Sequence, residues 1–250
     1  MANHVPLAKD KHASLKVVNS GDYTRFRNQN LIPIVARDFY SLASEFPLVF
    51  VTDKQSEAFT AVAIMGLQDG QNLYCQQEPY PAQVIPVGFS NAPFAIAPAD
   101  DKREQFVVMV DEDSHLLSES EGQPLFKENG EKTDYMEGRI ESLVQAAQQG
   151  EQMGQICKLL REKELLATHQ VQLQHRPDAR RYNIEGIYTV DEKKLNELSD
   201  DGFLELRKLG LVSLIYAHLM SLQQLRRVSE KQYEADTASV AAPSESAPAV

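Results

Sequence analysis

The sequence predicts an α+β fold, with an N-terminal half rich in antiparallel strands and C-terminal helices and a β-hairpin packed on it. Three observations lead to this prediction. Short apolar runs separated by turn signals fill the N-terminal half, apolar residues return at spacings of three and four after residue 133, and two alternating runs lie between helical stretches. A hairpin between helices favours one intertwined domain, which we expect to span residues 1–234, followed by a disordered Ala/Ser/Pro tail at 235–250.

The N-terminal half contains short predicted strands around one predicted helix. Residues 15–19 and 47–53 have the apolar pattern of strands. Between them, PIVARDFYSLASEF (33–46) carries apolar residues at helical spacing, and its proline suits a first helical turn. AFTAVAIMGL and QNLYC flank Asp69-Gly70, a dipeptide that supplies the positive φ angles of a type I′ turn, so we expect a hairpin there. QFVVMVDED predicts a further strand that leads into an acidic loop, and a second turn is predicted at Asn129-Gly130.

The C-terminal half changes to a helical period. Apolar residues at 140–160 indicate one or two amphipathic helices, with two glycines as possible breaks. HQVQLQH (169–175) and YNIEGIYTV (182–190) alternate and enclose the turn RPDAR, which predicts a β-hairpin. A short helix follows the second run. FLELRKLGLVSLIYAHLMSLQQLRRV (203–228) is apolar around most of its circumference in the middle, as expected of a helix buried on several sides.

Composition limits the classes of function. The chain has 250 residues, of which 42% are hydrophobic and 24% charged, values typical of a soluble protein that buries a core. Its net charge of -11 argues against nucleic acid as a partner, because affinity for the phosphate backbone depends on Lys and Arg. We expect no membrane span, since the longest uncharged run is broken by prolines. We expect Cys75 and Cys157, which lie among apolar neighbours, to be reduced and buried in a cytoplasmic protein. The N-terminus lacks the apolar region of a secretory signal.

Residues 72–94, NLYCQQEPYPAQVIPVGFSNAPF, concentrate prolines and aromatic rings in a stretch with one charged residue. Because proline fixes φ and removes a hydrogen-bond donor, such a segment suits an extended crossing over a core, with Tyr80, Phe89 and Phe94 as inserted anchors. A groove for a partner or ligand is the second interpretation, because extended proline-aromatic surfaces bind peptides and sugars. A catalytic loop is the third. Tyr80, Phe89 and Phe94 are therefore our candidate partner- or ligand-binding residues.

Residues able to support catalysis or bind a metal form no recognisable motif. The six histidines make no H-x-H, H-x-x-H or H-E-x-x-H pair, and neither a nucleophile elbow nor a phosphate-binding glycine loop occurs. His115 beside Asp111, Glu112 and Asp113 is the best loop constellation for a cation, with a solvated acidic turn as the simpler interpretation. His218 shares a helical face with a serine, which packing in the core also explains. We therefore leave the catalytic residues unknown, predict no cofactor and no metal site, and favour a non-enzyme.

The order and wording of several segments resemble the bacterial SapC family. The matching segments cover nearly the whole chain except the tail: VPLAKDKH, IPIVARDFYSLASEFPLVF, GQNLY, VIPVGFSNAPF, GQPLFKENG, IEGIYTVDEKKLNEL and LGLVSLIYAHLMSLQQL. The resemblance implies a protein without an established activity, whose family name is linked with a bacterial surface layer. It also implies an Arg-Arg-Tyr sequence in the proline-rich segment, where this chain has Ser90, Asn91 and Ala92.

These observations leave three functional hypotheses. The first is a non-enzymatic, cytoplasmic SapC-like protein that binds or regulates a protein partner in pathways related to the bacterial envelope or surface layer. The alternative is an accessory or enzyme domain that binds a small polar ligand or a metal near the acidic loop around His115. The third is an exported surface-layer subunit. The oligomeric state, the partner and the ligand stay open.

Overall fold

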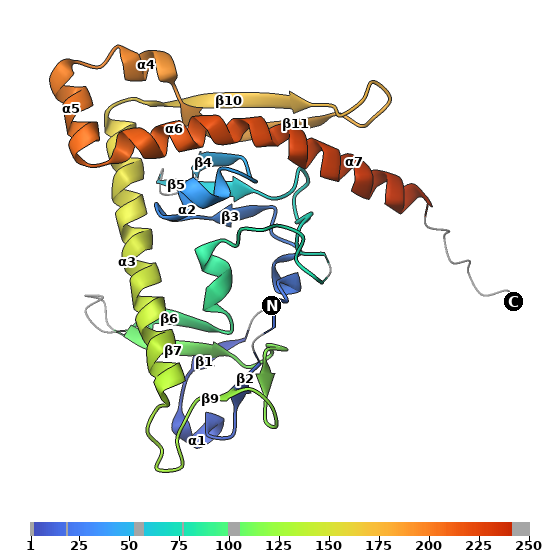
Figure 1. Ribbon diagram of the computed structural model, residues 1–250, viewed down its shortest axis with the longest axis vertical. Coiled ribbons are helices and arrows are strands. Elements are labelled where there is room, and N and C mark those ends of the chain that lie inside the picture. Colours follow the sequence, from blue (N-terminus) through green and yellow to red (C-terminus); the bar gives the residue numbers. More distant parts are fainter. Residues whose placement is uncertain (1–2, 19, 53–57, 77, 100–105, 242–250) are drawn as a thin grey trace, which may run out of the picture.

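The computed structural model describes residues 3–18, 20–52, 58–76, 78–99 and 106–241 (Figure 1). The strands are β1 His4–Pro6, β2 Lys16–Val17, β3 Leu31–Pro33, β4 Leu48–Thr52, β5 Phe59–Ile64, β6 Phe94–Pro98, β7 Phe106–Asp111, β8 Leu117–Ser118, β9 Gln123–Pro124, β10 Leu166–Leu173 and β11 Tyr182–Val190. The α-helices are α1 Lys9–His12, α2 Asp38–Leu42, α3 Asp134–Glu162, α4 Glu192–Asn196, α5 Asp200–Lys208, α6 Leu211–Ser221 and α7 Leu225–Ala241, and the 3₁₀ helices are η1 Thr24–Phe26, η2 Val87–Asn91 and η3 Leu222–Gln224.

The fold is α+β, with antiparallel sheets in the N-terminal half and helices that pack on them from the C-terminal half, as the sequence predicts. The largest sheet has the order β10-β11-β4-β5-β3, and each neighbouring pair is antiparallel. Two of its strands, β10 and β11, form the predicted hairpin, and they join the N-terminal strands through β4. The sheet therefore unites both halves of the chain.

Two smaller sheets lie at the other end of the molecule (Figure 1). One has the order β1-β7-β6, and the other has the order β8-β2-β9. Their apolar side chains form a separate cluster that includes Val17, Phe94, Val110 and Leu125. The main cluster combines residues of the five-stranded sheet, such as Leu48, with residues of the helices that cover it, such as Phe39. A third cluster includes Val49, Ile187 and Val228. The cluster of the small sheets and the main cluster are the two regions that one long helix joins.

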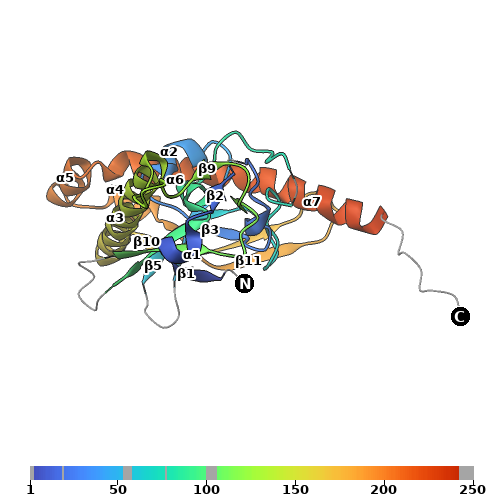
Figure 2. The ribbon, with the colours of Figure 1, turned by 90° about the horizontal axis from the view of Figure 1, so that it is seen from below.

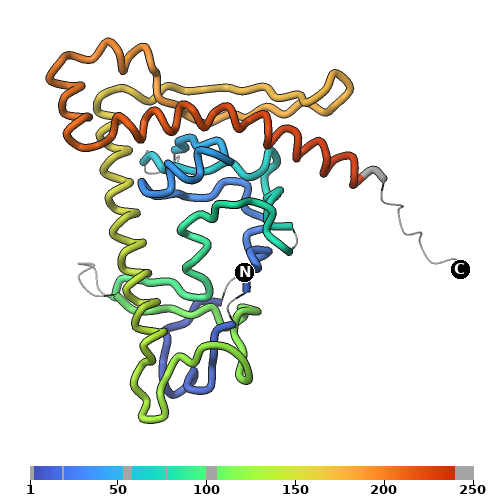
Figure 3. Tube along the Cα trace, viewed as in Figure 1, coloured from blue at the N-terminus to red at the C-terminus, as the bar shows by residue number. Residues whose placement is uncertain are grey.

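Helix α3 connects these two regions. It runs along one side of the molecule from the small sheets to the large one (Figure 3). Its N-terminal part contributes Met136 and Leu143 to the cluster of the small sheets, and its C-terminal part contributes Ile156 and Leu160 to the main cluster. The helix continues through both of the glycines that the sequence marks as possible breaks, because burial at its two ends outweighs the local preference of glycine.

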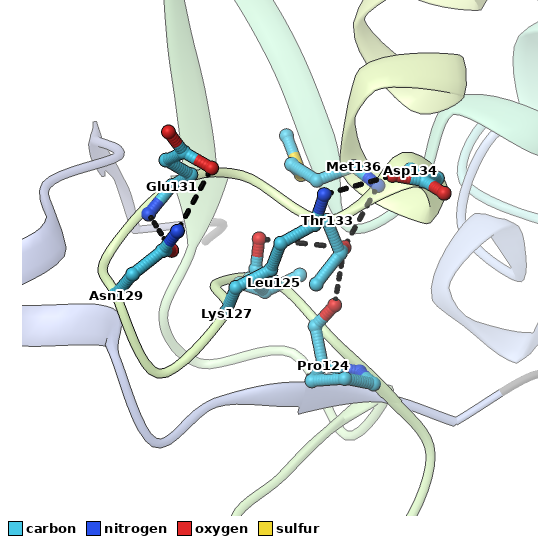
Figure 4. Close-up of polar contacts among 8 residues, drawn as sticks. All are labelled: Pro124, Leu125, Lys127, Asn129, Glu131, Thr133, Asp134 and Met136. Carbon is cyan, nitrogen blue, oxygen red and sulfur yellow. Dashed lines mark hydrogen bonds and ion pairs between the residues drawn. The ribbon is translucent and has the colours of Figure 1, made fainter.

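The first turn of α3 is held by a capped loop (Figure 4). Thr133 is the N-cap, and its hydroxyl accepts a hydrogen bond from the backbone N–H of Met136 at 3.2 Å. The same hydroxyl donates to the carbonyl of Pro124 in β9 at 2.7 Å. Lys127 and Asp134 form an exposed ion pair at 3.0 Å across the loop. The loop therefore fixes the start of α3 against the small sheet.

Three local predictions are wrong. Residues 33–46 form a helix only at α2, because Leu31–Pro33 pairs with β5 and the backbone N–H of Ile34 donates to Ala61. Asp69-Gly70 does turn the chain, but residues 71–75 form no strand and β5 pairs with β3 and β4 instead. The predicted helix at 203–228 is divided at Gly210, whose φ of +71° is the left-handed conformation that ends α5.

Helix α7 projects from the body of the molecule at its C-terminal end (Figure 2). It ends at Ala241, so the first part of the expected tail is helical. Residues 242–250 of the predicted tail lie outside the described residues.

Candidate functional site

A cleft of about 680 Å³ lies where the β8-β2-β9 sheet meets η2 and the first turns of α3. The small sheet contributes Val17 and Gln123, and the loop after it contributes Asp22. Helix η2 contributes Phe89 and Ser90. Helix α3 contributes Tyr135 and Arg139, which lie one turn apart and just after the Thr133 cap. Segments distant in the sequence therefore form one concave surface with apolar and polar side chains.

Asp22 and His115 form a polar pair beside the cleft. The Nε2 atom of His115 lies 2.6 Å from one carboxylate oxygen of Asp22, and the backbone N–H of Thr24 donates to the other at 2.7 Å. Burial raises the pKa of Asp22, but the hydrogen bonds from Thr24 and the charge of His115 outweigh it, so that the pKa lies below its ordinary value. The carboxylate is therefore ionised at neutral pH and is already compensated by a donor. His115 itself is half exposed.

Arg139 is the cation of the cleft wall. Its guanidinium donates to the backbone carbonyls of Ser90 and of Ala92, the second at 3.2 Å, and lies 6.0 Å from the centre of the Phe94 ring. These contacts tie α3 to η2 and to the residue that follows it. The Nε atom of Arg139 is buried and has no hydrogen-bond partner among the described residues. One donor of the guanidinium is thus left unused by the part of the protein that the structure describes.

A group of aromatic rings lies beside the cleft at η2. Phe89 is 2% exposed, stacks on Phe26 with ring centroids 4.0 Å apart, and stacks on Tyr23 at 5.3 Å. Tyr80 packs edge-on against Tyr23 at 5.2 Å. Of these rings, Tyr23 and Phe89 also line the cleft. The rings form a rigid apolar base for the polar groups beside them.

The structure separates the candidate residues Tyr80, Phe89 and Phe94 into two regions. The ring centroids of Tyr80 and Phe89 lie 6.2 Å apart in the aromatic group, where Tyr80 is partly buried. Phe94 starts β6 and is 3% exposed in the cluster of the small sheets. Phe89 and Phe94 therefore anchor the proline-rich segment in both cores, and Phe89 also lines the cleft. Ser90 and Ala92, at the positions where the resemblance implies Arg-Arg-Tyr, line the cleft as well.

The acidic loop around His115 does not converge on one point. Asp111 accepts a hydrogen bond from the backbone N–H of Asn3 at 2.8 Å. A carboxylate oxygen of Glu112 lies 3.0 Å from Nε2 of His12. Asp113 is exposed. Within the ranges that the structure describes, no three His, Cys, Asp or Glu side chains group as metal ligands would. This loop is linked to the cleft through the contact of His115 with the lining residue Asp22.

His218 and Ser221 are buried between α6 and the large sheet. Both side chains are 0% exposed. The backbone N–H of Val190 donates to Nε2 of His218 at 3.0 Å, so the proton of the neutral ring lies on Nδ1, which donates to the carbonyl of Leu48 at 2.8 Å. Ser221 accepts a hydrogen bond from the backbone N–H of Leu48 at 2.9 Å. The pair joins α6 to β4 and β11, in agreement with core packing.

An exposed apolar surface, which the sequence patterns do not reveal, lies on α2 and α6. Tyr40 is 60% exposed, Tyr216 37% and Met220 68%. Ser213, Tyr216 and Met220 follow one stripe of α6, and the Tyr40 hydroxyl lies 2.8 Å from the Ser213 hydroxyl. We call these four residues the α2–α6 face. Helices α2 and α6 are in contact, so the face is continuous (Figure 1).

Comparisons with known proteins place the chain in a family without adding a relative of known activity. No curated protein and no solved structure matches it. In the described part of the chain, no helix has both the length and the apolar character needed to cross a bilayer. The family model named SapC matches residues 7–228, which include every described strand except β1 and every described helix as far as the first turn of α7. This chain belongs to the SapC family.

Proposed function

We propose that this SapC-family protein is a non-enzymatic binding protein that docks a protein partner on the α2–α6 face. The observation that carries this proposal is the exposure of Tyr40, Tyr216 and Met220 on adjoining helices. Tyrosine and methionine are enriched in protein interfaces, because both supply large contact areas and Met adapts its shape to the partner. A partner with apolar side chains at the centre of its contact surface and polar groups around them fits this face.

The face is rigid enough to serve as a docking surface. Helix α6 is anchored from below by His218 and Ser221, whose hydrogen bonds with the large sheet are fully buried. Tyr40 is held from the side by Ser213. The exposed side chains therefore project from a fixed helix, which lowers the entropy lost when a partner binds.

Capture from cells that express the protein tests this proposal. The wild-type chain, Met220→Glu and Phe106→Ser are each used as bait, and captured proteins are quantified after cross-linking. Phe106 is 46% exposed on β7, so its substitution is a control for the loss of an exposed apolar side chain elsewhere. We expect one partner to bind the wild type and Phe106→Ser equally and to bind Met220→Glu at least ten-fold less. Equal capture by all three baits, or no specific partner, contradicts the proposal.

A second candidate function, binding of a small polar ligand, is favoured by the cleft. Its volume of about 680 Å³ is within the range of ligand sites in proteins, and ordered polar groups lie beside its aromatic base. Asp22 lines the cleft and is paired with His115 of the acidic loop. A ligand that raises the unfolding temperature of the wild type but not of Asp22→Asn supports this function. An equal rise in both proteins contradicts it.

We also propose the cytoplasm as the compartment. Cys75 and Cys157 are free and buried, and burial raises the pKa of Cys75 to about 12 and that of Cys157 to about 11, so both thiols are protonated and unreactive. Stable free thiols suit a reducing compartment. A link with envelope or surface-layer pathways is supported by the family resemblance. Fractionation of native cells separates this proposal from an exported subunit, for which the protein must appear at the cell surface.

A further inference from the structure

We propose that the cleft between the small sheet and α3 binds a neutral, hydroxyl-rich ligand of the saccharide type. This inference deepens the second candidate function, because it names the class of ligand, and it is independent of the partner proposed for the α2–α6 face. It rests on the charge balance of the cleft, on its combination of rings and polar groups, and on its volume.

The charge balance selects a neutral ligand. The cleft contains one carboxylate, Asp22, which is satisfied by His115 and by the backbone N–H of Thr24. It contains one guanidinium, Arg139, which is held by two backbone carbonyls. Each ion already has partners within the protein, so neither requires a counter-charge from a ligand. A neutral ligand adds hydrogen bonds and leaves these interactions in place.

The lining offers both donors and acceptors beside apolar surface. Tyr23 and Tyr135 have hydroxyl groups, Gln123 has an amide that both donates and accepts, and Ser90 lies on the opposite side of the lining, in η2. The Asp22 carboxylate, an acceptor, also lines the cleft beside its partners His115 and Thr24. A sugar ring has hydroxyl groups that donate and accept at once, and its C–H faces pack on aromatic rings. The cleft supplies such hydrogen-bonding groups beside the Tyr23 and Tyr135 rings.

Arg139 marks a polar side of the cleft, where backbone carbonyls of Ser90 and Ala92 hold its guanidinium. The volume of the cleft has room for a short oligosaccharide rather than for a single small ion.

Titration with a defined panel of sugars tests the inference. The probes are glucose, galactose, N-acetylglucosamine and the trisaccharides maltotriose, cellotriose and chitotriose, measured by saturation-transfer NMR and calorimetry on the full chain. Inorganic phosphate, lysine and the neutral peptide triglycine are tested alongside. The variants are Asp22→Asn and Tyr135→Phe in the cleft. Asp113→Asn and Tyr216→Phe, which make the same changes at exposed positions outside the cleft lining, are the matched controls.

We expect at least one sugar to bind the wild type, with affinity reduced ten-fold or more in Asp22→Asn and Tyr135→Phe and unchanged in both controls. Stronger binding of phosphate or lysine than of any sugar overturns the neutral class. Binding of triglycine alone, lost in Asp22→Asn, overturns the saccharide assignment while supporting a small-ligand cleft. Sugar binding that is equal in all variants, or no binding by any probe, overturns the inference and leaves the α2–α6 proposal untouched, because partner capture is measured separately.

Discussion

The Nδ1 atom of His218 lies 2.8 Å from the carbonyl oxygen of Leu48 and donates a hydrogen bond to it inside the core. The other ring nitrogen accepts from the backbone N–H of Val190. One imidazole therefore satisfies an acceptor of β4 and a donor of β11 that α6 covers. The neutral form of the ring is required, since protonation of Nε2 would set two donors against each other.

The stability of the protein should fall as the pH drops from about 6.5 to about 4 because of His218. Burial lowers the pKa of His218 to about 4, from an ordinary value of 6.5. Between these values the unfolded chain binds the proton and the folded chain does not, so the contribution is complete above 6.5 and is lost as the pH falls toward 4. A shift of this size corresponds to about 3 kcal/mol of unfolding free energy.

Urea denaturation of the wild type and His218→Leu at several pH values measures this contribution. Subtracting the two free energies of unfolding cancels the carboxylates that titrate in both proteins. We expect a difference of about 3–5 kcal/mol at pH 7.5, because the variant leaves two buried backbone groups unpaired. That difference should shrink at pH 4.5. A constant difference across this range would show that the ring does not titrate as inferred, and an NMR titration of the wild-type ring gives the same answer without the variant.

The contribution of Asp38 to the free energy of unfolding should depend on pH in the direction opposite to that of His218. Its carboxylate is 3% exposed and accepts hydrogen bonds from the backbone N–H groups of Val35 at 3.1 Å and Val87 at 3.2 Å. Burial raises the pKa of Asp38 and outweighs those hydrogen bonds. The folded state thus binds the proton more tightly than the unfolded state. The contribution is complete below the ordinary pKa and decreases as the pH rises through the raised pKa.

Replacement of Asp38 measures how strongly it fixes the segment that enters η2. Asp38→Ala leaves two backbone donors unsatisfied, so we expect a loss of about 2–4 kcal/mol in the free energy of unfolding. Asp38→Asn keeps one side-chain acceptor and should lose less. The exposed Asp113→Ala is the control. If Asp38→Ala and Asp113→Ala unfold at the same urea concentration, the two hydrogen bonds do not stabilise the fold.

The N-cap of α3 should contribute about 1 kcal/mol. Thr133→Ala removes the hydroxyl that accepts from Met136 and donates to Pro124, while Thr133→Ser retains it. We expect the alanine variant to lose about 1 kcal/mol, or up to about 2 because the hydroxyl serves two partners, and the serine variant to lose much less. Equal losses in the two variants would assign the effect to the methyl group rather than to the cap. Guanidinium denaturation resolves a difference of this size.

The fold was predictable where the sequence pattern and the tertiary contacts agree. The alternation at 169–175 and 182–190 predicts the β10–β11 hairpin, although the register shifts between His169 and Val171 and β10 has no fully buried residue. At residues 33–46 they disagree, because apolar spacing fits a helix but β5 offers hydrogen bonds to Leu31–Pro33. Gly210 divides the long C-terminal helix through its positive φ, which the apolar pattern around it conceals.

The cleft was less predictable than the fold. Asp22 follows β2 and His115 precedes β8, and neither loop contains a motif that predicts the other as its partner. His115 drew attention because of the acidic residues beside it, yet its partner is a different carboxylate. The α2–α6 face was equally hidden. The apolar sequence of this helix suggests that Tyr216 and Met220 are buried. Only the position of α6 on the sheet shows which side of the helix faces outward.

The glycines within α3 give a prediction that runs against the usual effect of changing a glycine in an ordered element. Gly154 lies inside the helix, and a Cβ built on it meets no heavy atom within 4 Å. Close packing therefore does not require a glycine at this position, and glycine lowers the stability of a helix. Gly154→Ala should therefore raise the free energy of unfolding by about 0.5–1 kcal/mol. Gly66→Ala is the contrasting control, because its Cβ would collide with the backbone of Gln71, and it should destabilise the protein. A loss of stability in Gly154→Ala would mean that the space above the helix is occupied in solution, for example by a ligand or by another part of the chain.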